Sequence, residues 1–241
     1  MIFALFLLAT PASDQTPSVF LRGQINANTV DQVRVAAEHG ARHLIITSSG
    51  GYRESGVELG EIIAQYDMDV SVDQYCFSAC ASFAFVAARN RFIYPGSVIG
   101  FHKTSTAYEN LAEIHHLQEL KANVSDRARR ERALYEARGV DRKLLLDPFV
   151  ATGPTCYQIT VTQQGNERVE VRQRAAFWYP TLDYLRSAGI TDSLEHWPQS
   201  EDDLRQRLQK INLSYALAYS YGEPMPREAG EKILEEIEPC T

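Results

Sequence analysis

Reactive and hydrogen-bonding groups follow three apolar segments of this sequence, at the point where each segment ends. The first segment ends in Ser48-Ser-Gly-Gly51, the second in Cys76-Phe-Ser-Ala-Cys80, and the third in Gly100-Phe-His102. Active sites of α/β proteins are built just beyond the carboxyl ends of strands. The pattern therefore predicts a site that combines a hydroxyl, an imidazole and glycine backbone from three separate strand ends.

Ser78 and His102 are the residues suited to nucleophilic catalysis. A serine hydroxyl reacts poorly unless a base removes its proton and hydrogen-bond donors stabilise the oxyanion that forms. Ser78 stands where a strand gives way to a helix, so the N–H of Ala79 and the helix N-terminus would face the developing charge. Gly51 could bring a second backbone N–H close, because glycine has no side chain to intervene. His102 is the natural base.

Each of these features also has an ordinary structural explanation. A Ser before an apolar helix is commonly an N-cap, and a Gly-Gly pair commonly forms a turn. Other reactive groups are weaker candidates: Ser82 lies one turn into the apolar helix, and a buried Cys80 thiol would be inert. His115 and His116 are adjacent and do not share a helix face, so joint metal binding is not expected. No cofactor and no metal ion are predicted.

The elements that must position these groups alternate between strands and helices. Strand patterns cover residues 18–25, 43–47, 68–72, 90–94 and 97–101. Helical patterns cover residues 29–38, 54–66 and 79–88, and Asn28 is expected to cap the first of them. This alternation indicates βαβ units with a mainly parallel sheet, so the fold class is α/β.

The second half of the chain has a different pattern. Residues 108–138 contain no Gly or Pro and carry a thin apolar stripe, which predicts one long or broken helix that packs against another subunit or projects. Residues 156–173 alternate as a β-hairpin whose turn contains Gln164-Gly-Asn166. Helices are further predicted at 141–147, at 181–188 and, in two parts, between 201 and 240.

The order of the three motif segments resembles that of the Clp protease proteolytic subunit and its relatives in the ClpP/crotonase superfamily. There a strand ends in Asn-Ser-Pro-Gly-Gly, a later segment carries the nucleophile as Ala-Ser-Met-Gly, and an Arg-Phe…His stretch carries the base. Here Ile46-Thr-Ser-Ser-Gly-Gly51, Cys76–Cys80 and Arg91–His102 are similar. The chain looks most like periplasmic ClpP-like proteins with a Cys-x-Ser-Ala-Cys motif, and the resemblance extends to residues 180–192.

The resemblance implies a ClpP/crotonase-like ββα superhelix over residues 18–193. Two additions to this domain are expected, a hairpin inserted at about 156–173 and a helical C-terminal extension over 194–241. The resemblance further implies Ser78 as nucleophile and His102 as general base. The N–H groups of Gly51 and Ala79 match the oxyanion hole.

The resemblance leaves the identity of one residue open, the acid that would orient the imidazole. Asp147 is similar in place to the acid of the family, although the hairpin that follows it has no counterpart there, and Asp141 is its competitor. An Asp at this position would hold the imidazole in the correct tautomer. Without such an acid, a Ser/His dyad would be weaker but still able to react.

Two function hypotheses follow. The first is an exported serine hydrolase, most simply a peptidase, that acts on a peptide or protein through an acyl-enzyme. Crotonases use the same pair of N–H groups for thioester enolates, but a Ser/His pair is a hydrolase feature. The second is a non-catalytic ClpP-like scaffold or assembly protein, favoured if a bridge between Cys76 and Cys80 distorts the Ser78 turn. A homo-oligomer is expected, although the extension could block stacking.

Composition limits the classes of partner and the location that the chain can have. The 241 residues carry a formal net charge of -7 without a compact Lys/Arg cluster, which argues against nucleic acid. The first nine residues are apolar and precede Thr10-Pro-Ala12, so residues 1–12 are predicted to be a signal peptide, despite the missing basic region; a buried N-terminal strand is the alternative. No other run is long enough to span a membrane.

The cysteine count agrees with export to the periplasm or beyond. The four cysteines are an even number that an exported protein can pair. A bridge between Cys156 and Cys240 would hold the tail in place. A bridge between Cys76 and Cys80 becomes possible if Cys76 ends a strand and Cys80 opens a helix.

Overall fold

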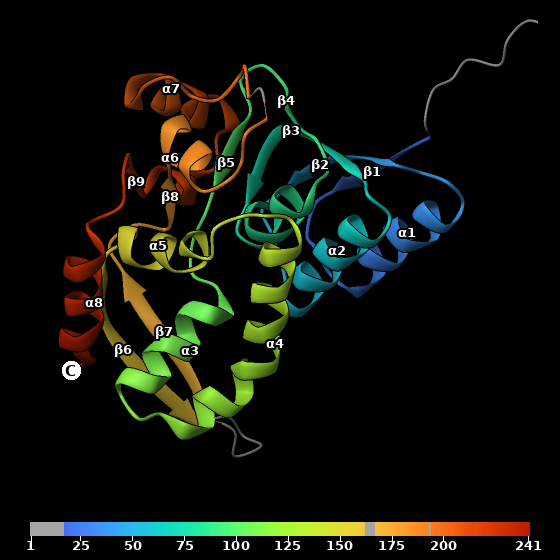
Figure 1. Cartoon of the computed structure of the whole chain (residues 1–241). Helices are drawn as coiled ribbons and strands as arrows, with labels where there is room; N and C mark the ends of the chain where they lie inside the picture. Colours follow the sequence, from blue (N-terminus) through green and yellow to red (C-terminus); the bar gives the residue numbers. More distant parts are fainter. Residues whose placement is uncertain (1–16, 162–166, 193) are drawn as a thin grey trace, which may run out of the picture.

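The computed structural model describes residues 17–161, 167–192 and 194–241 (Figure 1). The predicted signal peptide at residues 1–12, the hairpin turn Gln164-Gly-Asn166 and the predicted domain boundary at Ser193 fall outside the described residues. The strands are β1 (Ser18–Arg22), β2 (His43–Ser48), β3 (Asp69–Phe77), β4 (Arg91–Ile93), β5 (Val98–Gly100), β6 (Pro154–Val161), β7 (Glu167–Gln173), β8 (Phe177–Tyr179), β9 (Tyr219–Tyr221) and β10 (Glu238–Pro239). The helices are α1 (Ala27–Glu38), α2 (Arg53–Gln65), the π-helix η1 (Cys80–Phe85), α3 (Ser105–Ile114), α4 (Gln118–Ala137), α5 (Lys143–Ala151), α6 (Leu182–Ser187), α7 (Glu201–Ile211), the 3-10 helix η2 (Ser214–Leu217) and α8 (Arg227–Glu236).

A parallel sheet brings the three motif segments to one edge. Its strands run in the order β1-β2-β3-β4, and β5 also pairs with β3. The first half of β3 pairs with β4 and its second half with β5, both in parallel. Between the halves, Gln74 has φ +69 and its N–H donates to Ser97 Oγ at 2.9 Å. Because β3 continues past this irregularity, it ends beside Gly100, whose carbonyl accepts from Ser78 N at 3.0 Å.

The helix α1 begins two residues earlier than the sequence pattern indicates. Asn26, and not Asn28, is its cap: Asn26 Oδ1 accepts from the backbone N–H of Thr29 at 3.1 Å, and Thr29 Oγ1 accepts from the backbone N–H of Asn26 at 3.0 Å. Thr29 stands three residues after Asn26, so the two side chains satisfy each other's backbone donors. The prediction of Asn28 as cap was wrong because the reciprocal pair of Asn26 and Thr29 starts the helix at Ala27.

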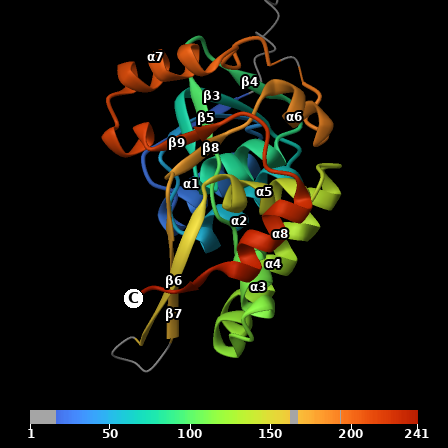
Figure 2. The same ribbon diagram turned by 90° about the vertical axis from the view of Figure 1, so that its left-hand side faces the viewer.

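The predicted long helix is broken into α3 and α4. The break falls at His115 to Leu117, where His116 has φ +56, and the two helices pack against each other. The apolar stripe is buried within this chain, against strands β6 and β7 and helix α8 (Figure 2). The buried residues of this cluster include Tyr108, Leu111, Leu120 and Val124 from the helices and Tyr157, Val169 and Val171 from the strands. The stripe is therefore covered without a second subunit.

The C-terminal extension is tied to the strands β6 and β8. Strand β9 pairs with β8 in parallel, and β10 pairs with β6 in parallel. A disulfide joins Cys156 to Cys240, with the two Cα atoms 5.1 Å apart. Within the described residues, no helix has both the length and the apolar character needed to cross a membrane.

Loss of the Cys156–Cys240 bridge is expected to lower the free energy of unfolding by about 2–4 kcal/mol. The bridge closes a loop with a sequence separation of 84, so it removes much conformational freedom from the unfolded chain. Urea unfolding of the Cys156→Ser/Cys240→Ser double variant, followed by tryptophan fluorescence, measures this change. A change below about 0.5 kcal/mol would contradict the expectation, because surface substitutions without such a role fall in that range.

Candidate active site

Ser78 and His102 meet at the carboxyl edge of the parallel sheet. Ser78 Oγ lies 2.5 Å from His102 Nε2, and the two residues are 24 positions apart in the sequence. Ser78 follows β3, and His102 follows β5, the strand that pairs with the end of β3. Parallel pairing of these strands therefore places the hydroxyl and the imidazole at the same edge. A neutral imidazole accepts the Ser78 O–H through Nε2.

Ser78 occupies a strained turn that its surroundings hold in place. Its φ of +58 is unusual for a residue with a side chain. A disulfide joins Cys76, on β3, to Cys80, the first residue of the buried π-helix η1, with the Cα atoms 5.2 Å apart. This is the strand-to-helix arrangement in which the sequence allows the bridge. The disulfide leaves the Ser78–His102 contact intact, so the condition that favours a scaffold is not met.

Gly50 makes the closest backbone approach to Ser78. A Cβ atom at Gly50 would lie 2.6 Å from Ser78 Cβ and 3.0 Å from Ser78 Oγ. Gly50 also has φ +93, which few residues other than glycine adopt. At Gly51 the restriction has another cause, since a Cβ atom there would lie 2.0 Å from the carbonyl oxygen of Ile25. Both positions therefore exclude a side chain, and at Gly50 the excluded atom would meet Ser78.

The N–H groups of Gly51 and Ala79 donate no hydrogen bond within the described part of the chain. Beside Gly51, the N–H of Ile25 donates to Gly50 O at 2.8 Å, and the N–H of Tyr52 donates to Ile25 O at 3.1 Å. Neighbouring strand residues face opposite ways, so the N–H of Gly51 points away from Ile25. Ala79 comes just before helix η1, where N–H groups have no intrahelical partner. Two donors are thus available next to the Ser78 turn.

His102 is held neutral by its surroundings. Its ring centroid lies 5.3 Å from that of Phe177, on β8. Burial is the main cause that lowers the pKa of His102 to about 3, and the positive charges of Lys103 and Arg53 lower it further. The imidazole is therefore in its proton-accepting form at neutral pH.

The lowered pKa of His102 predicts a dependence of stability on pH. The unfolded chain protonates this group near pH 6.5 and the folded chain only near pH 3. The unfolded state thus binds more protons between these values, and stability that is complete above pH 6.5 falls as the pH falls toward 3. In His102→Gln the free energy of unfolding is expected to vary less between pH 6.5 and pH 4. An unchanged slope in urea-unfolding series at stepped pH would contradict this.

The structure pairs Asp147 with a different residue from the one expected. Tyr184 Oη donates to Asp147 Oδ2 at 2.5 Å, and burial together with this hydrogen bond raises the pKa of Tyr184. The charged groups that act on His102 are both cations. The competitor Asp141 is exposed, and its Oδ1 accepts from the backbone N–H of Lys143 at 2.9 Å. The structure thus brings Ser78 to His102 and neither acid to the imidazole.

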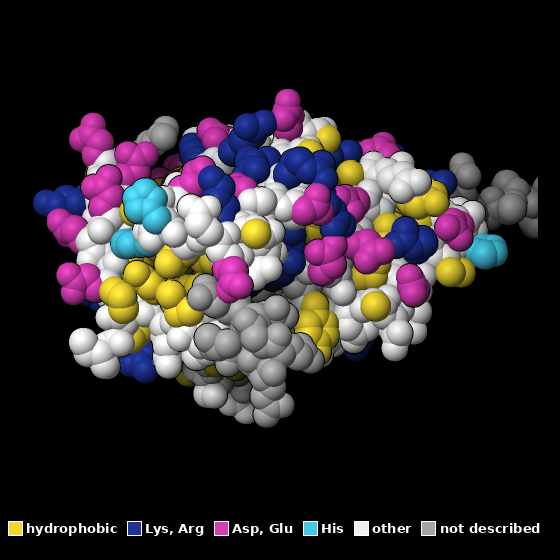
Figure 3. All heavy atoms as spheres, turned by 90° about the horizontal axis from the view of Figure 1, so that it is seen from below, with side chains coloured by type: hydrophobic (Ala, Val, Ile, Leu, Met, Phe, Trp, Pro, Cys, Tyr) yellow, Lys and Arg dark blue, Asp and Glu magenta, His cyan; other side chains and the backbone are white. Residues whose placement is uncertain are grey.

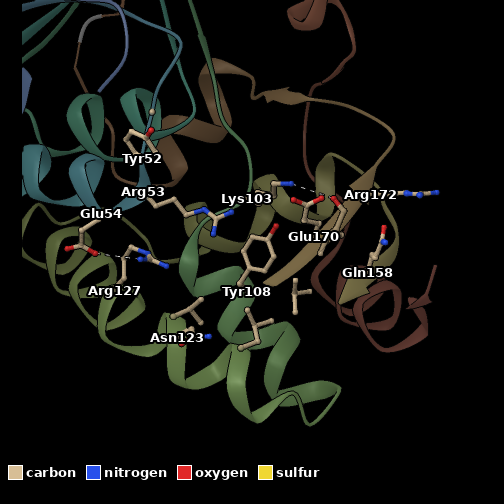
Figure 4. A pocket seen from close by; sticks show the side chains of 15 residues that line it. Tyr52, Arg53, Glu54, Lys103, Tyr108, Asn123, Arg127, Gln158, Glu170 and Arg172 are labelled. Carbon is tan, nitrogen blue, oxygen red and sulfur yellow. Dashed lines mark hydrogen bonds and ion pairs between the residues drawn. The ribbon is translucent and has the colours of Figure 1, made fainter. Parts of the chain in front are cut away.

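A groove of about 760 Å³ opens beside this site (Figure 4). It is lined by Gly51, Arg53 and Lys103, by Tyr108 and Arg127 from α3 and α4, and by residues of β6 and β7. Arg53 and Lys103 stand two residues after Gly51 and one after His102, a proximity that could have identified them from the sequence. No sequence signal identifies the lining residues from β6, β7 and α4, because their place in the groove depends on how distant segments pack.

Comparisons with known proteins give only weak similarities. No family model matches the chain, and no curated protein matches it. A variant of the 1510-N membrane-bound stomatin-specific protease is 22% identical with a TM-score of 0.30, covering 34% of this chain and 45% of that chain. A second variant, in complex with a substrate peptide, is 20% identical with a TM-score of 0.29, covering 36% of this chain and 43% of that chain. The match thus spans less than half the length of either protease chain.

A variant of ClpP1 from Listeria monocytogenes is similar over a longer stretch. It is 17% identical with a TM-score of 0.41, and the match covers 78% of this chain and 94% of that chain. Similarities of this strength do not assign the chain to a family. The candidate site therefore rests on its own geometry.

Proposed function

We propose that the chain is a serine peptidase that acts through a dyad of Ser78 and His102. The observation that carries the proposal is the 2.5 Å contact between Ser78 Oγ and His102 Nε2 at a strained strand-to-helix turn. The N–H groups of Gly51 and Ala79, which have no acceptor among the described residues, support it, because acyl transfer needs donors for the oxyanion. Such a turn presents a nucleophilic serine in other hydrolase folds.

The reaction begins with transfer of the Ser78 proton to His102 Nε2 as Oγ attacks the carbonyl carbon of the peptide bond. The oxyanion accepts hydrogen bonds from the N–H groups of Gly51 and Ala79. The imidazolium then gives its proton to the leaving amine, and the C–N bond breaks to leave an acyl-enzyme. Water, deprotonated by His102, attacks the ester, and the imidazolium returns this proton to Ser78 Oγ as the ester bond breaks and the acid leaves.

The two disulfides support an oxidising location for this peptidase, such as the periplasm or the exterior of the cell. Export by an N-terminal signal and assembly into a homo-oligomer stay predictions from the sequence. The alternative, a non-catalytic scaffold, loses its specific support, since the Cys76–Cys80 bridge leaves Ser78 in contact with His102.

Digestion of a proteome-derived peptide mixture tests the proposal. Mass spectrometry of the new termini should show cleavages by the native chain that are absent with Ser78→Ala. Ser82→Ala is the matched control, because Ser82 lies four residues further on and its buried Oγ has no hydrogen-bond partner in the described chain. Cleavage that is equal in the native chain and in Ser78→Ala would contradict the proposal.

A further inference from the structure

Two cations of the groove beside the candidate site have no carboxylate partner within the described residues. Arg53 is partly buried, and its guanidinium carbon lies 4.6 Å from the ring centroid of Tyr108. Lys103 Nζ donates only to the backbone carbonyl of Val171, at 3.5 Å. Neither side chain forms an ion pair in the described part of the chain. A positive charge held in a groove without a counter-charge is suited to an anionic ligand.

The other charges of the groove are already paired or face solvent. Arg127 lies 3.5 Å from Glu54, and Glu54 also pairs with Arg130, which in turn lies 2.7 Å from Glu61. Glu170 is exposed on β7. Arg53 and Lys103 thus differ from the charged side chains of the groove that form ion pairs. No carboxylate of the described residues forms an ion pair with either of these two side chains.

Arg53 and Lys103 line the same groove, next to Ser78 and His102. Figure 4 shows the Arg53 guanidinium beside the ring of Tyr108 and the Lys103 ammonium directed toward β7, where it donates to Val171 O. Gly51, which carries one proposed oxyanion donor, lines the same groove. Although the whole chain has a net charge of -7, Lys and Arg side chains also gather on its surface, as Figure 3 shows near the middle of the face seen from below.

We propose that this groove recognises a carboxylate of the peptide substrate, with Arg53 and Lys103 as the recognition residues. The inference rests on the proposed peptidase function for its choice of ligand. A guanidinium presents paired donors that match the two oxygens of a carboxylate, and an ammonium adds a compact charge. The carboxylate belongs either to an Asp or Glu side chain near the scissile bond or to the C-terminus of the peptide.

Carboxylate binding would also assist the reaction. Lys103 and Arg53 both oppose protonation of His102. An anion bound in the groove would offset their charge and stabilise the imidazolium that forms as Ser78 attacks. An acidic substrate would thereby supply the negative charge that Asp147, bonded to Tyr184, does not supply in this structure.

Binding to the Ser78→Ala protein tests the inference without any catalytic step. The probes are Ala-Ala-Glu-Ala-Ala and Ala-Ala-Gln-Ala-Ala, each with a free or an amidated C-terminus and an uncharged BODIPY dye, followed by fluorescence anisotropy at low salt. A carboxylate-bearing peptide should bind about tenfold more tightly than amidated Ala-Ala-Gln-Ala-Ala. The amidated Glu peptide and the free-acid Gln peptide show which carboxylate is recognised.

Variants of the Ser78→Ala protein assign the effect to the groove. Adding Arg53→Gln or Lys103→Gln should remove most of the preference. Adding Lys210→Gln, which removes the same charge from the exposed end of α7, should leave it unchanged. Equal binding of all four peptides, or no binding of any, would overturn the inference. A preference that survives both groove substitutions would overturn it as well. None of these results bears on the peptidase proposal, which depends on cleavage by the Ser78 form.

Discussion

Replacement of His102 by Ala is expected to slow the reaction of Ser78 with a fluorophosphonate probe by about 10²–10⁴-fold. In the proposed mechanism the imidazole accepts the serine proton across the 2.5 Å contact, and the lowered pKa of His102 keeps the imidazole neutral at pH 7. Without this acceptor the hydroxyl is a poor nucleophile. The measurement is the second-order labelling rate at pH 7.5, with the same folded fraction verified for both proteins by circular dichroism.

The matched control is Asp147→Asn, which changes the acid that the sequence favours. Because Asp147 accepts from Tyr184 in this structure, the variant is expected to lose less than about tenfold in labelling rate, well below the usual contribution of a general base. A loss as large as that of His102→Ala would show that Asp147 acts on the imidazole. That result would contradict a dyad and restore the triad.

Replacement of Gly50 by Ala is expected to abolish most of the labelling, by about 10²-fold or more, because the added methyl group would lie 2.6 Å from Ser78 Cβ. Real Cβ atoms do not approach other atoms so closely, so either the Ser78 turn or the glycine turn must move. A shift of about 1 Å in a reacting group is enough to cost that factor. The readout is again the labelling rate, together with the thermal midpoint.

Gly40→Ala is the control that distinguishes the clash with Ser78 from the conformational cost of a side chain at positive φ. Gly40 has φ +96, close to the +93 of Gly50, but a Cβ atom there would have nothing within 4 Å. Both variants carry the same conformational penalty, of about 1 kcal/mol. Gly40→Ala should therefore lower stability and keep the labelling rate of the folded protein. Equal labelling by both variants would show that Gly50 does not constrain Ser78.

The sequence was sufficient to predict a mainly parallel sheet and the proximity of Ser78 and His102. Apolar segments that end in Gly50-Gly51, in Ser78 and in His102 predicted three strand ends, and the structure places these ends at one edge of a mainly parallel sheet. This part was predictable because strand pairing and the identity of residues at strand ends follow from local pattern. The two cysteine pairs also lie at disulfide distance, as their positions allowed.

The rest depended on packing between distant segments. Which carboxylate reaches an imidazole depends on the orientation of α5, and α5 directs Asp147 to Tyr184 on α6. The partner of the apolar stripe on α3 and α4 lies more than thirty residues away, in a hairpin that local pattern cannot place. Likewise, the role of Gly50 became visible only when its distance to Ser78 was known.

The most direct measurement is the site of reaction of the folded, native chain with a fluorophosphonate. Intact mass and fragment spectra should show one adduct per chain, located on Ser78; the adduct should be absent after unfolding in urea and strongly reduced in His102→Ala after the same reaction time. Absence of any adduct on the folded chain, or an adduct on a serine other than Ser78, would contradict the assignment of Ser78 as a nucleophile activated by His102.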